Sequence, residues 1–203
     1  MRFSPFLLLF SVFLSGCASL SKEECVGGDW GNIGTRDAIE GHQSDRLKEH
    51  KDACERYDII PDPNAYMQGY EKGLVTYCTP TNGFSVGRNG YEYNSICHKT
   101  SEAEFLRGYL RGRALHELET RIAELELELS RTERLITDAR HEAKAPKKGK
   151  PQEKTKASER NKDLPALMRD RDQIRFELDR LRFERGQALL AADEFLLSVS
   201  SET

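Results

Sequence analysis

A heptad pattern of apolar residues in the second half of the chain most constrains its fold. Apolar or small residues alternate in steps of three and four positions through Leu115, Leu118, Ile122, Leu125, Leu129, Thr132, Ile136, Ala139 and Ala143. The spacing resumes through Leu164, Leu167, Arg171, Ile174, Leu178, Leu181, Arg185, Ala188, Ala192, Phe195 and Val199. It places one apolar stripe along a helix and is typical of coiled coils. We therefore predict two long helices within residues 113–199.

These two helices can bury their stripes against each other or against another chain. At 1.5 Å per residue, each helix of roughly 40 residues would be about 60 Å long. An antiparallel hairpin buries both stripes within one molecule, and we favour it over an intermolecular coiled coil. The overall composition agrees with thin helical packing rather than a broad core, because 37% of residues are hydrophobic and 32% are charged.

Residues 144–162, between the two helices, form a basic segment without an apolar face. This segment holds eight Lys or Arg residues and two Glu residues. Such a composition predicts a disordered linker. The positive charge could bind anionic lipid or lipopolysaccharide head groups, but we favour a solvated spacer.

The N-terminus carries a predicted export signal over residues 1–16. Arg2 precedes an apolar run that begins at Phe6 and is too short to span a bilayer. The run closes on Leu14-Ser15-Gly16-Cys17, which resembles the lipobox of bacterial lipoproteins. That resemblance implies a diacylglycerol on Cys17, which would become the first residue of the mature chain. The alternative is an ordinary signal peptide followed by an incidental cysteine.

Residues 17–24 are expected to form a short lipidated tether. Ala18 follows the predicted acylated cysteine, and it is not the Asp that favours retention in the inner membrane of Gram-negative bacteria. The resemblance to lipoproteins of such bacteria therefore implies an outer-membrane protein that faces the periplasm.

Four further cysteines, Cys25, Cys54, Cys78 and Cys97, suit an oxidising compartment. They allow three pairings, and we favour Cys25–Cys54 with Cys78–Cys97 because each bond closes a local loop. A metal site that uses His98 or His42 is the alternative. We disfavour it because no C-x-x-C pair is present to begin a zinc site.

The cysteines fall in a region, residues 25–112, that we predict to be a small disulfide-stapled helical domain. Thr35 and Asp37 suggest a first helix start, and Asp62-Pro63 is a stronger one that leads to a helix ending near Tyr77. Two Asn-Gly pairs in residues 79–94 predict a β-hairpin or an irregular loop. The segment 101–104, Ser-Glu-Ala-Glu, resembles a capping box that opens the long helix. The predicted fold class is therefore mainly α, with a stapled helical domain followed by a long antiparallel coiled-coil hairpin.

An internal repeat stands out in this region. Residues 66–73 and 105–112 both read aromatic-x-x-Gly-Tyr-x-x-Gly on predicted helices. Glycine inside a helix costs about 1 kcal/mol relative to Ala, and two glycines four residues apart share one helix face. We interpret the repeat as a site of close helix packing. The alternative is an aromatic surface for a sugar or peptide, formed by Trp30, Tyr66, Tyr70 and Tyr109.

The same residues carry a family resemblance. The features are Cys25, Trp30-x-x-Ile33-Gly34, Asp37-x-x-x-Gly41, the two Gly-Tyr-x-x-Gly helices and the loop from Tyr77-Cys78 to Cys97. Together they resemble an uncharacterised family of bacterial lipoproteins known only as a domain of unknown function. The resemblance covers residues 25 to about 118 and implies no catalytic role.

The sequence also bears on activity and partners. The five His residues are scattered and match no hydrolase or metalloprotease motif. The segment from Gly83 to Gly90 lacks the Lys of a phosphate-binding loop. We therefore expect no enzyme activity, no cofactor and no metal. A structural or adaptor protein is favoured, with the membrane and another envelope protein or the cell wall as partners, and the compartment argues against nucleic acid. A glycan- or peptide-binding module is the alternative, and the oligomeric state stays open.

Overall fold

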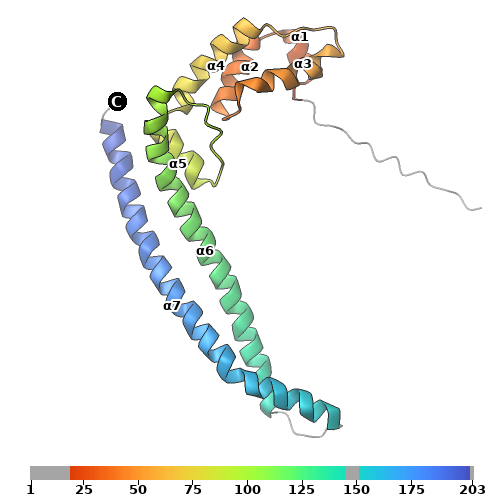
Figure 1. The fold of residues 1–203 in the computed structure, drawn as a ribbon, viewed down its shortest axis with the longest axis vertical. Helices are drawn as coiled ribbons and strands as arrows, with labels where there is room; N and C mark the ends of the chain where they lie inside the picture. Colours follow the sequence, from red (N-terminus) through yellow and green to blue (C-terminus); the bar gives the residue numbers. More distant parts are fainter. Residues whose placement is uncertain (1–18, 145–150, 202–203) are drawn as a thin grey trace, which may run out of the picture. The chain divides into compact units, whose positions relative to one another are not determined.

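The computed structural model describes residues 19–144 and 151–201, with side chains described for 19–141 and 163–201. Over these ranges the chain folds into helices joined by loops, and the described residues contain no strand (Figure 1). The predicted mainly α fold is therefore confirmed. The chain divides into two compact units, Met1–Leu74 and Val75–Thr203, which we call unit 1 and unit 2. The two disulfide-bonded regions fall in different units, whereas the sequence analysis places them in one domain.

Unit 1 begins with α1, Lys22–Gly27, where a continuous tether was expected. Ser21 caps this helix: its side chain accepts a hydrogen bond from the Glu24 N–H, and the Glu24 side chain bonds the Ser21 N–H in return. Leu20 is only 3% exposed. The predicted tether is therefore wrong from residue 19 onward, because this segment is anchored by capping and apolar burial.

The next elements of unit 1 are α2, Trp30–Ile39, the 3-10 helix η1, Ser44–Arg46, and α3, Leu47–Glu55. The prediction that a helix starts at Thr35 is wrong, because Asp29 caps α2 and accepts a hydrogen bond from the Asn32 N–H at 3.1 Å. Asp37 lies inside α2, buried, instead of in an exposed first turn.

Helix α4, Pro63–Tyr77, follows the prediction. Asp62 accepts hydrogen bonds from the N–H groups of Asn64 and Ala65 at 2.9 and 3.1 Å. Pro63 occupies the first helical position, where its missing N–H has no intrahelical partner to lose. The predicted start and end of this helix are confirmed.

The first helix that lies wholly in unit 2 is α5, Pro80–Arg88, in a segment for which the sequence predicts a hairpin or loop. Thr79 caps α5 by accepting a hydrogen bond from the Asn82 N–H at 3.2 Å, so the first Asn-Gly pair lies within the first helical turn. The second Asn-Gly pair does reverse the chain, since Gly90 has a φ of 76° and ends the helix. The prediction failed because two signals compete here. The helix-start signal of Thr79-Pro80 outweighs the turn signal of the first Asn-Gly pair.

The long helices are α6, Lys99–Lys144, and α7, Pro151–Ser201. Helix α6 starts two residues before the predicted capping box, because the His98 carbonyl accepts hydrogen bonds from the N–H groups of Ser101 and Glu102. Glu104 forms an ion pair with Arg107 instead of closing a capping box.

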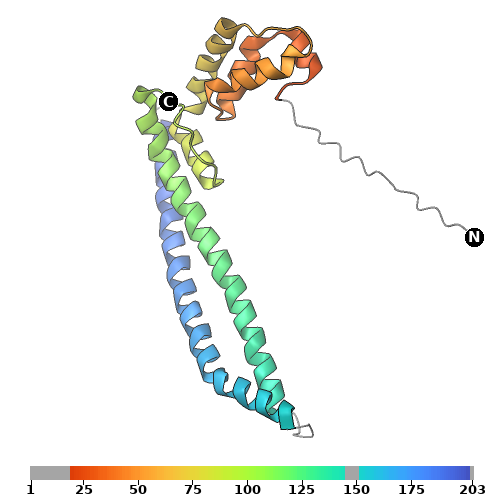
Figure 2. The same ribbon diagram turned by 45° about the vertical axis from the view of Figure 1, so that its right-hand side comes forward.

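Helices α6 and α7 run antiparallel side by side (Figure 2). The ion pairs Arg121–Glu177 at 3.1 Å, Arg175–Glu133 at 2.6 Å and Arg182–Glu126 at 2.8 Å join the two helices along the seam. The residues buried along the seam include Leu115, Ile122, Leu125, Thr132, Ile136, Ala139, Ile174, Leu178, Leu181, Ala192, Phe195 and Val199. All of these positions belong to the predicted heptads, so the hairpin is confirmed.

The N-terminal part of α7 corrects the linker prediction. Residues 151–162 are helical, so disorder over 144–162 is wrong for that part, and residues 145–150 lie outside the described residues. Pro151 suits a first helical position, and each residue added to an existing helix gains one backbone hydrogen bond without a new nucleus. Pro165 lies inside α7, which bends in its cyan part in Figure 1, as expected where a backbone hydrogen bond is lost.

The described helices contain no segment long and apolar enough to cross a bilayer.

Candidate functional site

The first candidate residue, the lipidation site Cys17, lies outside the described residues. From Ser19 onward the chain is held by contacts within unit 1. Ser19 Oγ lies 2.9 Å from His50 Nδ1, and Leu20 is buried. A lipid on Cys17 would therefore be attached two residues from a folded domain.

His50 belongs to a buried polar cluster that the sequence analysis missed. His50 and Asp37 are 0% and 1% exposed. Because an ionised carboxylate only accepts, His50 donates from Nε2 to Asp37 Oδ2 at 2.7 Å. The Tyr66 hydroxyl donates to the same oxygen at 2.8 Å, and Arg46 Nε lies 3.5 Å from Asp37 Oδ1. We call Ser19, Asp37, His50 and Tyr66 the anchor clamp.

The electrostatics of the anchor clamp favour a charged Asp37. Burial by itself raises the pKa of the Asp37 carboxyl, but hydrogen bonds from His50 and Tyr66, with the charges of His50 and Arg46, outweigh burial and hold this pKa below its usual value. Burial and the bond to Asp37 raise the pKa of Tyr66, which keeps its hydroxyl protonated as a donor. The carboxylate is therefore the centre of the cluster.

The anchor clamp contains the residue types of a hydrolytic triad without an accessible site. In such a triad, the His must exchange a proton with the nucleophile and with the leaving group. His50 has no exposed surface, so a leaving group cannot reach its ring. The geometry therefore suits a structural clamp that ties the start of the folded chain to α2, α3 and α4.

Two disulfides occupy the four predicted cysteines. Cys25 of α1 bonds to Cys54 of α3, and Cys78 bonds to Cys97 across α5, with Cα–Cα distances of 5.5 and 5.6 Å. The favoured pairing is confirmed. The cysteine sulfur atoms that the alternative metal site would need as ligands are used in these two bonds.

Loss of the first disulfide should destabilise unit 1. Replacing Cys25 and Cys54 with Ala frees a loop with a sequence separation of 29 in the unfolded chain, and the expected loss of unfolding free energy is about 3 kcal/mol. Trp30, the sole Trp, is buried in unit 1, so its fluorescence during chemical denaturation measures this loss. The exposed neighbour Val26, changed to Ala, is the matched control. Equal midpoints for the disulfide variant and the control would contradict the prediction.

The repeated glycines lie where two helix pairs make backbone contact. In unit 1, a Cβ added to Gly69 of α4 would overlap the Gly31 carbonyl of α2, and one added to Gly73 would lie 2.7 Å from the Ala38 Cβ. In unit 2, Gly108 of α6 is pressed in the same way against the Pro80 carbonyl of α5. The close-packing interpretation of the repeat is therefore confirmed.

The repeat extends to the helices that the glycines touch. A glycine with positive φ follows the C-cap of each helix: Gly41 after α2, with a φ of 82°, and Gly90 after α5, with a φ of 76°. In both cases the next N–H bonds back five residues, from His42 to the Asp37 carbonyl and from Tyr91 to the Val86 carbonyl. Both helices thus end in the same Schellman motif.

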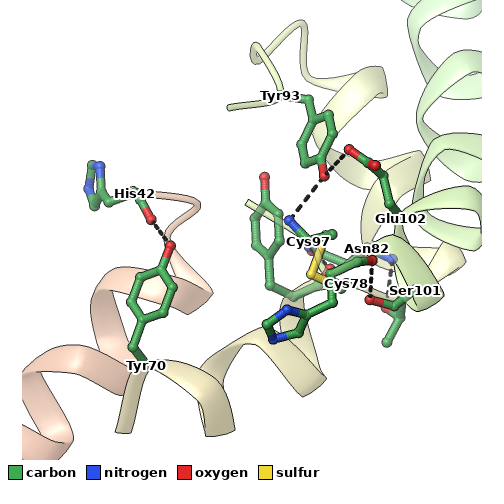
Figure 3. Close-up of a disulfide and its surroundings, with 11 residues drawn as sticks. His42, Tyr70, Cys78, Asn82, Tyr93, Cys97, Ser101 and Glu102 are labelled. Carbon is green, nitrogen blue, oxygen red and sulfur yellow. Dashed lines mark hydrogen bonds between the residues drawn. A yellow bond between two sulfur atoms is a disulfide. The ribbon is translucent and has the colours of Figure 1, made fainter. Parts of the chain in front are cut away.

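The tyrosine of each Gly-Tyr pair binds this helix end. The Tyr70 hydroxyl donates to the His42 carbonyl at 2.6 Å (Figure 3), and the Tyr109 hydroxyl donates to the Tyr91 carbonyl at 3.2 Å. The two units therefore contain the same helix pair, with the same glycine contact and the same tyrosine bond. The sequence showed the repeated octad, but not the shared partner helix, because α2 and α5 have few identical residues.

These contacts remove most of the predicted aromatic surface. Trp30, Tyr66 and Tyr70 are 6%, 0% and 4% exposed, and Tyr109 is partly buried. The prediction that they form an exposed platform is wrong, because their rings fill the helix-pair interiors and the hydroxyls of the three tyrosines bond within each unit.

Aromatic rings also fill the second helix pair. Phe105 packs on Tyr77 and Tyr93 with ring centroids 5.1 and 4.6 Å apart. The Tyr93 hydroxyl accepts a hydrogen bond from the Cys97 N–H and donates to Glu102, both at 3.1 Å (Figure 3). Burial, more than any other cause, raises the pKa of Tyr93 to about 12. The segment between α5 and α6, which carries Tyr93 and Cys97, is therefore packed onto the core of the second helix pair.

The outer face of α7 is the remaining candidate surface. Large apolar side chains recur there every seven residues, and they are 75%, 69%, 61% and 72% exposed at Phe176, Phe183, Leu190 and Leu197. We call these four residues the outer stripe. Its spacing is visible in the sequence, but these residues occupy a different register of α7 from the heptads of the buried seam.

Comparison with known proteins adds one finding. No curated protein and no solved structure matches the chain. The profile of a family described as "Protein of unknown function (DUF2799)" matches residues 29–114. This match begins at the cap of α2 and ends two residues after Gly112, so it covers both helix pairs and leaves most of the hairpin outside. Residues 29–114 are thus similar to an uncharacterised family that is defined over the two glycine-packed helix pairs.

Proposed function

We propose that this chain is a lipid-anchored structural or adaptor protein of the bacterial envelope, which acts through protein contacts of the α6–α7 hairpin. In this proposal Cys17 carries the lipid, the anchor is in the outer membrane, and the folded part faces the periplasm. The partner is a protein or the cell wall, and the chain performs no catalysis.

The outer stripe is the observation that carries the proposal. Single exposed apolar residues are ordinary on protein surfaces, whereas several large ones gathered on one face call for an explanation such as an interaction site. The outer stripe aligns four large side chains along one helix, and two of them are phenylalanines. All four lie on the face of α7 opposite its buried seam residues, so a partner protein can reach them. The outer stripe therefore supports a protein contact made by the hairpin.

The anchor clamp supports the lipid-anchor part of the proposal. It fixes Ser19 within unit 1, so a lipid on Cys17 would hold that unit close to the membrane surface. The burial of Trp30, Tyr66 and Tyr70 removes the observation that favoured glycan or peptide binding.

The contact is tested by crosslinking the full-length protein in cells. A photocrosslinking amino acid at Gln187, which lies between Phe183 and Leu190, should capture a polypeptide, and the same group at Ser85 of α5, away from the hairpin seam, is the control. Mass spectrometry of the mature N-terminus tests the anchor. Capture of no polypeptide at Gln187 contradicts the contact, and a Cys17 without an acyl group contradicts the anchor.

A further inference from the structure

We propose that one face of unit 1, close to the lipid anchor, rests on zwitterionic phospholipid head groups of the membrane that holds the anchor. This face consists of Lys22 and Val26 of α1 together with Arg56, Tyr57 and Ile60, which follow the end of α3. We call these five residues the anchor face. The inference rests on the lipid-anchor part of the proposed function, because it names the lipid that the anchored unit touches. It concerns unit 1 alone.

Contacts within unit 1 bring the anchor face together. The Lys22 ammonium lies 5.7 Å from the centroid of the Tyr57 ring, and the Arg56 guanidinium lies 5.8 Å from the same centroid. Val26 follows Lys22 by four residues, so both side chains lie on one side of α1. A single aromatic ring therefore joins α1 to the segment after α3.

The chain after α3 turns back toward that helix. Asp58 has a φ of 57°, and the next N–H, that of Ile59, bonds the Cys54 carbonyl at 3.4 Å. Cys54 is in turn joined to Cys25 of α1 by the first disulfide. Ile60 directly follows this turn, so it stays close to α1 and belongs to the same region of unit 1.

The short connection to the lipid decides what meets this region. Cys17 is two residues before Ser19, and an extended chain covers at most about 3.6 Å per residue, or roughly 7 Å here. Ser19 is hydrogen-bonded to His50, and α1 begins at Lys22, three residues later. Each head-group layer of a bilayer is about 5–8 Å thick. A helix of a partner protein is about 10 Å thick and would not fit in that gap, whereas head groups do.

The side chains of the anchor face suit a membrane interface. Tyrosine, lysine and arginine combine an apolar body with a polar tip, so they can lie partly among apolar groups and partly in water. Val26 and Ile60 add apolar surface, since they are 64% and 83% exposed. The hydroxyls of Tyr66 and Tyr70 are bonded inside unit 1, but the Tyr57 hydroxyl has no hydrogen-bond partner among residues 19–141 and 163–201. It is left to bond a head group.

The charges favour a zwitterionic lipid over an anionic one. The exposed acidic residues Glu23, Glu55 and Asp58 adjoin the anchor face in the sequence, so its two basic residues give the region no surplus of positive charge. Segments that bind anionic lipid depend on such a surplus, because each extra Lys or Arg adds attraction. A head group with both a phosphate and an ammonium offers a partner to the basic and to the acidic side chains.

The first test asks which side of unit 1 meets lipid. The full-length protein is purified from cell membranes and reconstituted in vesicles of phosphatidylcholine and phosphatidylethanolamine. A photocrosslinking amino acid at Ile60 should form a phospholipid adduct, which mass spectrometry detects. The same group at Gln68, exposed on α4, is the control and should form roughly fivefold less adduct, because docking favours one orientation of the unit. Equal yields at the two positions would overturn the proposal.

The acyl mass on Cys17, measured in the same sample, separates this inference from the function on which it rests. An acylated protein that captures no lipid at Ile60 overturns the anchor face and leaves the lipid anchor in place. A Cys17 without an acyl group contradicts the anchor, and the anchor face with it.

The second test changes the anchor face. With the crosslinking group at Val26, Ile60→Glu should reduce the lipid adduct roughly fivefold, because it removes apolar contact and adds a charge that must stay hydrated. Ile39→Glu is the matched control, since Ile39 is also exposed but lies at the end of α2. Unchanged helical circular dichroism in both variants shows that unit 1 still folds. An adduct yield that Ile60→Glu leaves unchanged contradicts the proposal.

The third test changes the lipid. Adding anionic phosphatidylglycerol to the vesicles should leave the adduct yield at Ile60 within about twofold of its original value, because the region has no surplus of positive charge. A several-fold rise in yield would show that anionic lipid is the partner and would overturn the proposal.

Discussion

Replacing Gly69 with Ala should unfold or strongly destabilise unit 1, with an expected loss of about 3 kcal/mol or more. The new Cβ would overlap the Gly31 carbonyl, which is backbone and cannot rotate away. Overpacking of a tight core commonly costs 1–3 kcal/mol, and a clash with a helix backbone belongs at the high end of the range. Separating α2 from α4 would also weaken the hydrogen bond that the Thr35 hydroxyl donates to the Gly69 carbonyl at 2.9 Å.

The measurement is chemical denaturation of the chain from residue 18 onward, followed by Trp30 fluorescence. Gly27→Ala in α1 is the matched control, because a Cβ there meets nothing within 4 Å. The free energy of unfolding of this control should stay within about 0.5 kcal/mol of the wild-type value. If Gly69→Ala behaved like Gly27→Ala, the close approach of α2 and α4 would be refuted.

Local signals predicted the parts of the fold that rest on strong patterns. The two heptad series placed α6 and α7 in a hairpin, because a stripe such as Leu125 with Leu178 has to be buried somewhere. Asp62-Pro63 located the start of α4, since capping depends on adjacent residues alone. The disulfides followed from the preference for short loops.

The errors arose where a local signal competed with a contact made by distant residues. Asp37 suggests a helix start by its type, but its real partners are His50 and Tyr66, which lie on other helices. Asn82-Gly83 suggests a turn, but Gly83 is there to let α5 approach Phe105 of α6. No window of the sequence contains both members of such a pair.

The same limit explains the aromatic residues. Trp30 and the repeated tyrosines are common in binding surfaces, and their types alone allowed that interpretation. The structure assigns Tyr70 and Tyr109 to helix ends that lie far away in the sequence. The outer stripe shows the opposite case: its residues are exposed, and its spacing is visible in the sequence alone. A sequence repeat therefore indicates that its residues share a role. Whether that role is packing inside the protein or contact at its surface depends on the residues that each one touches in the fold.

Asp37→Asn should be the most damaging change in the anchor clamp, with an expected loss of about 3 kcal/mol near neutral pH. The substitution keeps the shape of the side chain but removes its negative charge. That charge lies on the carboxylate that accepts hydrogen bonds from His50 and Tyr66 and that faces Arg46. Asp45→Asn is the matched control. The Asp45 side chain is exposed, and its Oδ2 lies 4.0 Å from Lys48 Nζ in a surface ion pair, which contributes little to stability. Its effect should stay below about 0.5 kcal/mol.

The loss should also depend on pH. The folded protein lowers the pKa of the Asp37 carboxyl, so ionisation of this group favours folding. The stabilisation is fully present above the unfolded value of about 3.9 and is lost as the pH falls through the lower, folded value. Denaturation followed by Trp30 fluorescence should therefore show a constant gap between wild type and Asp37→Asn from neutral pH down to about 5, and a shrinking gap below about 4. A gap that stays constant through the acid range would mean that Asp37 contributes packing alone, and that the charge at the centre of the anchor clamp adds nothing to stability.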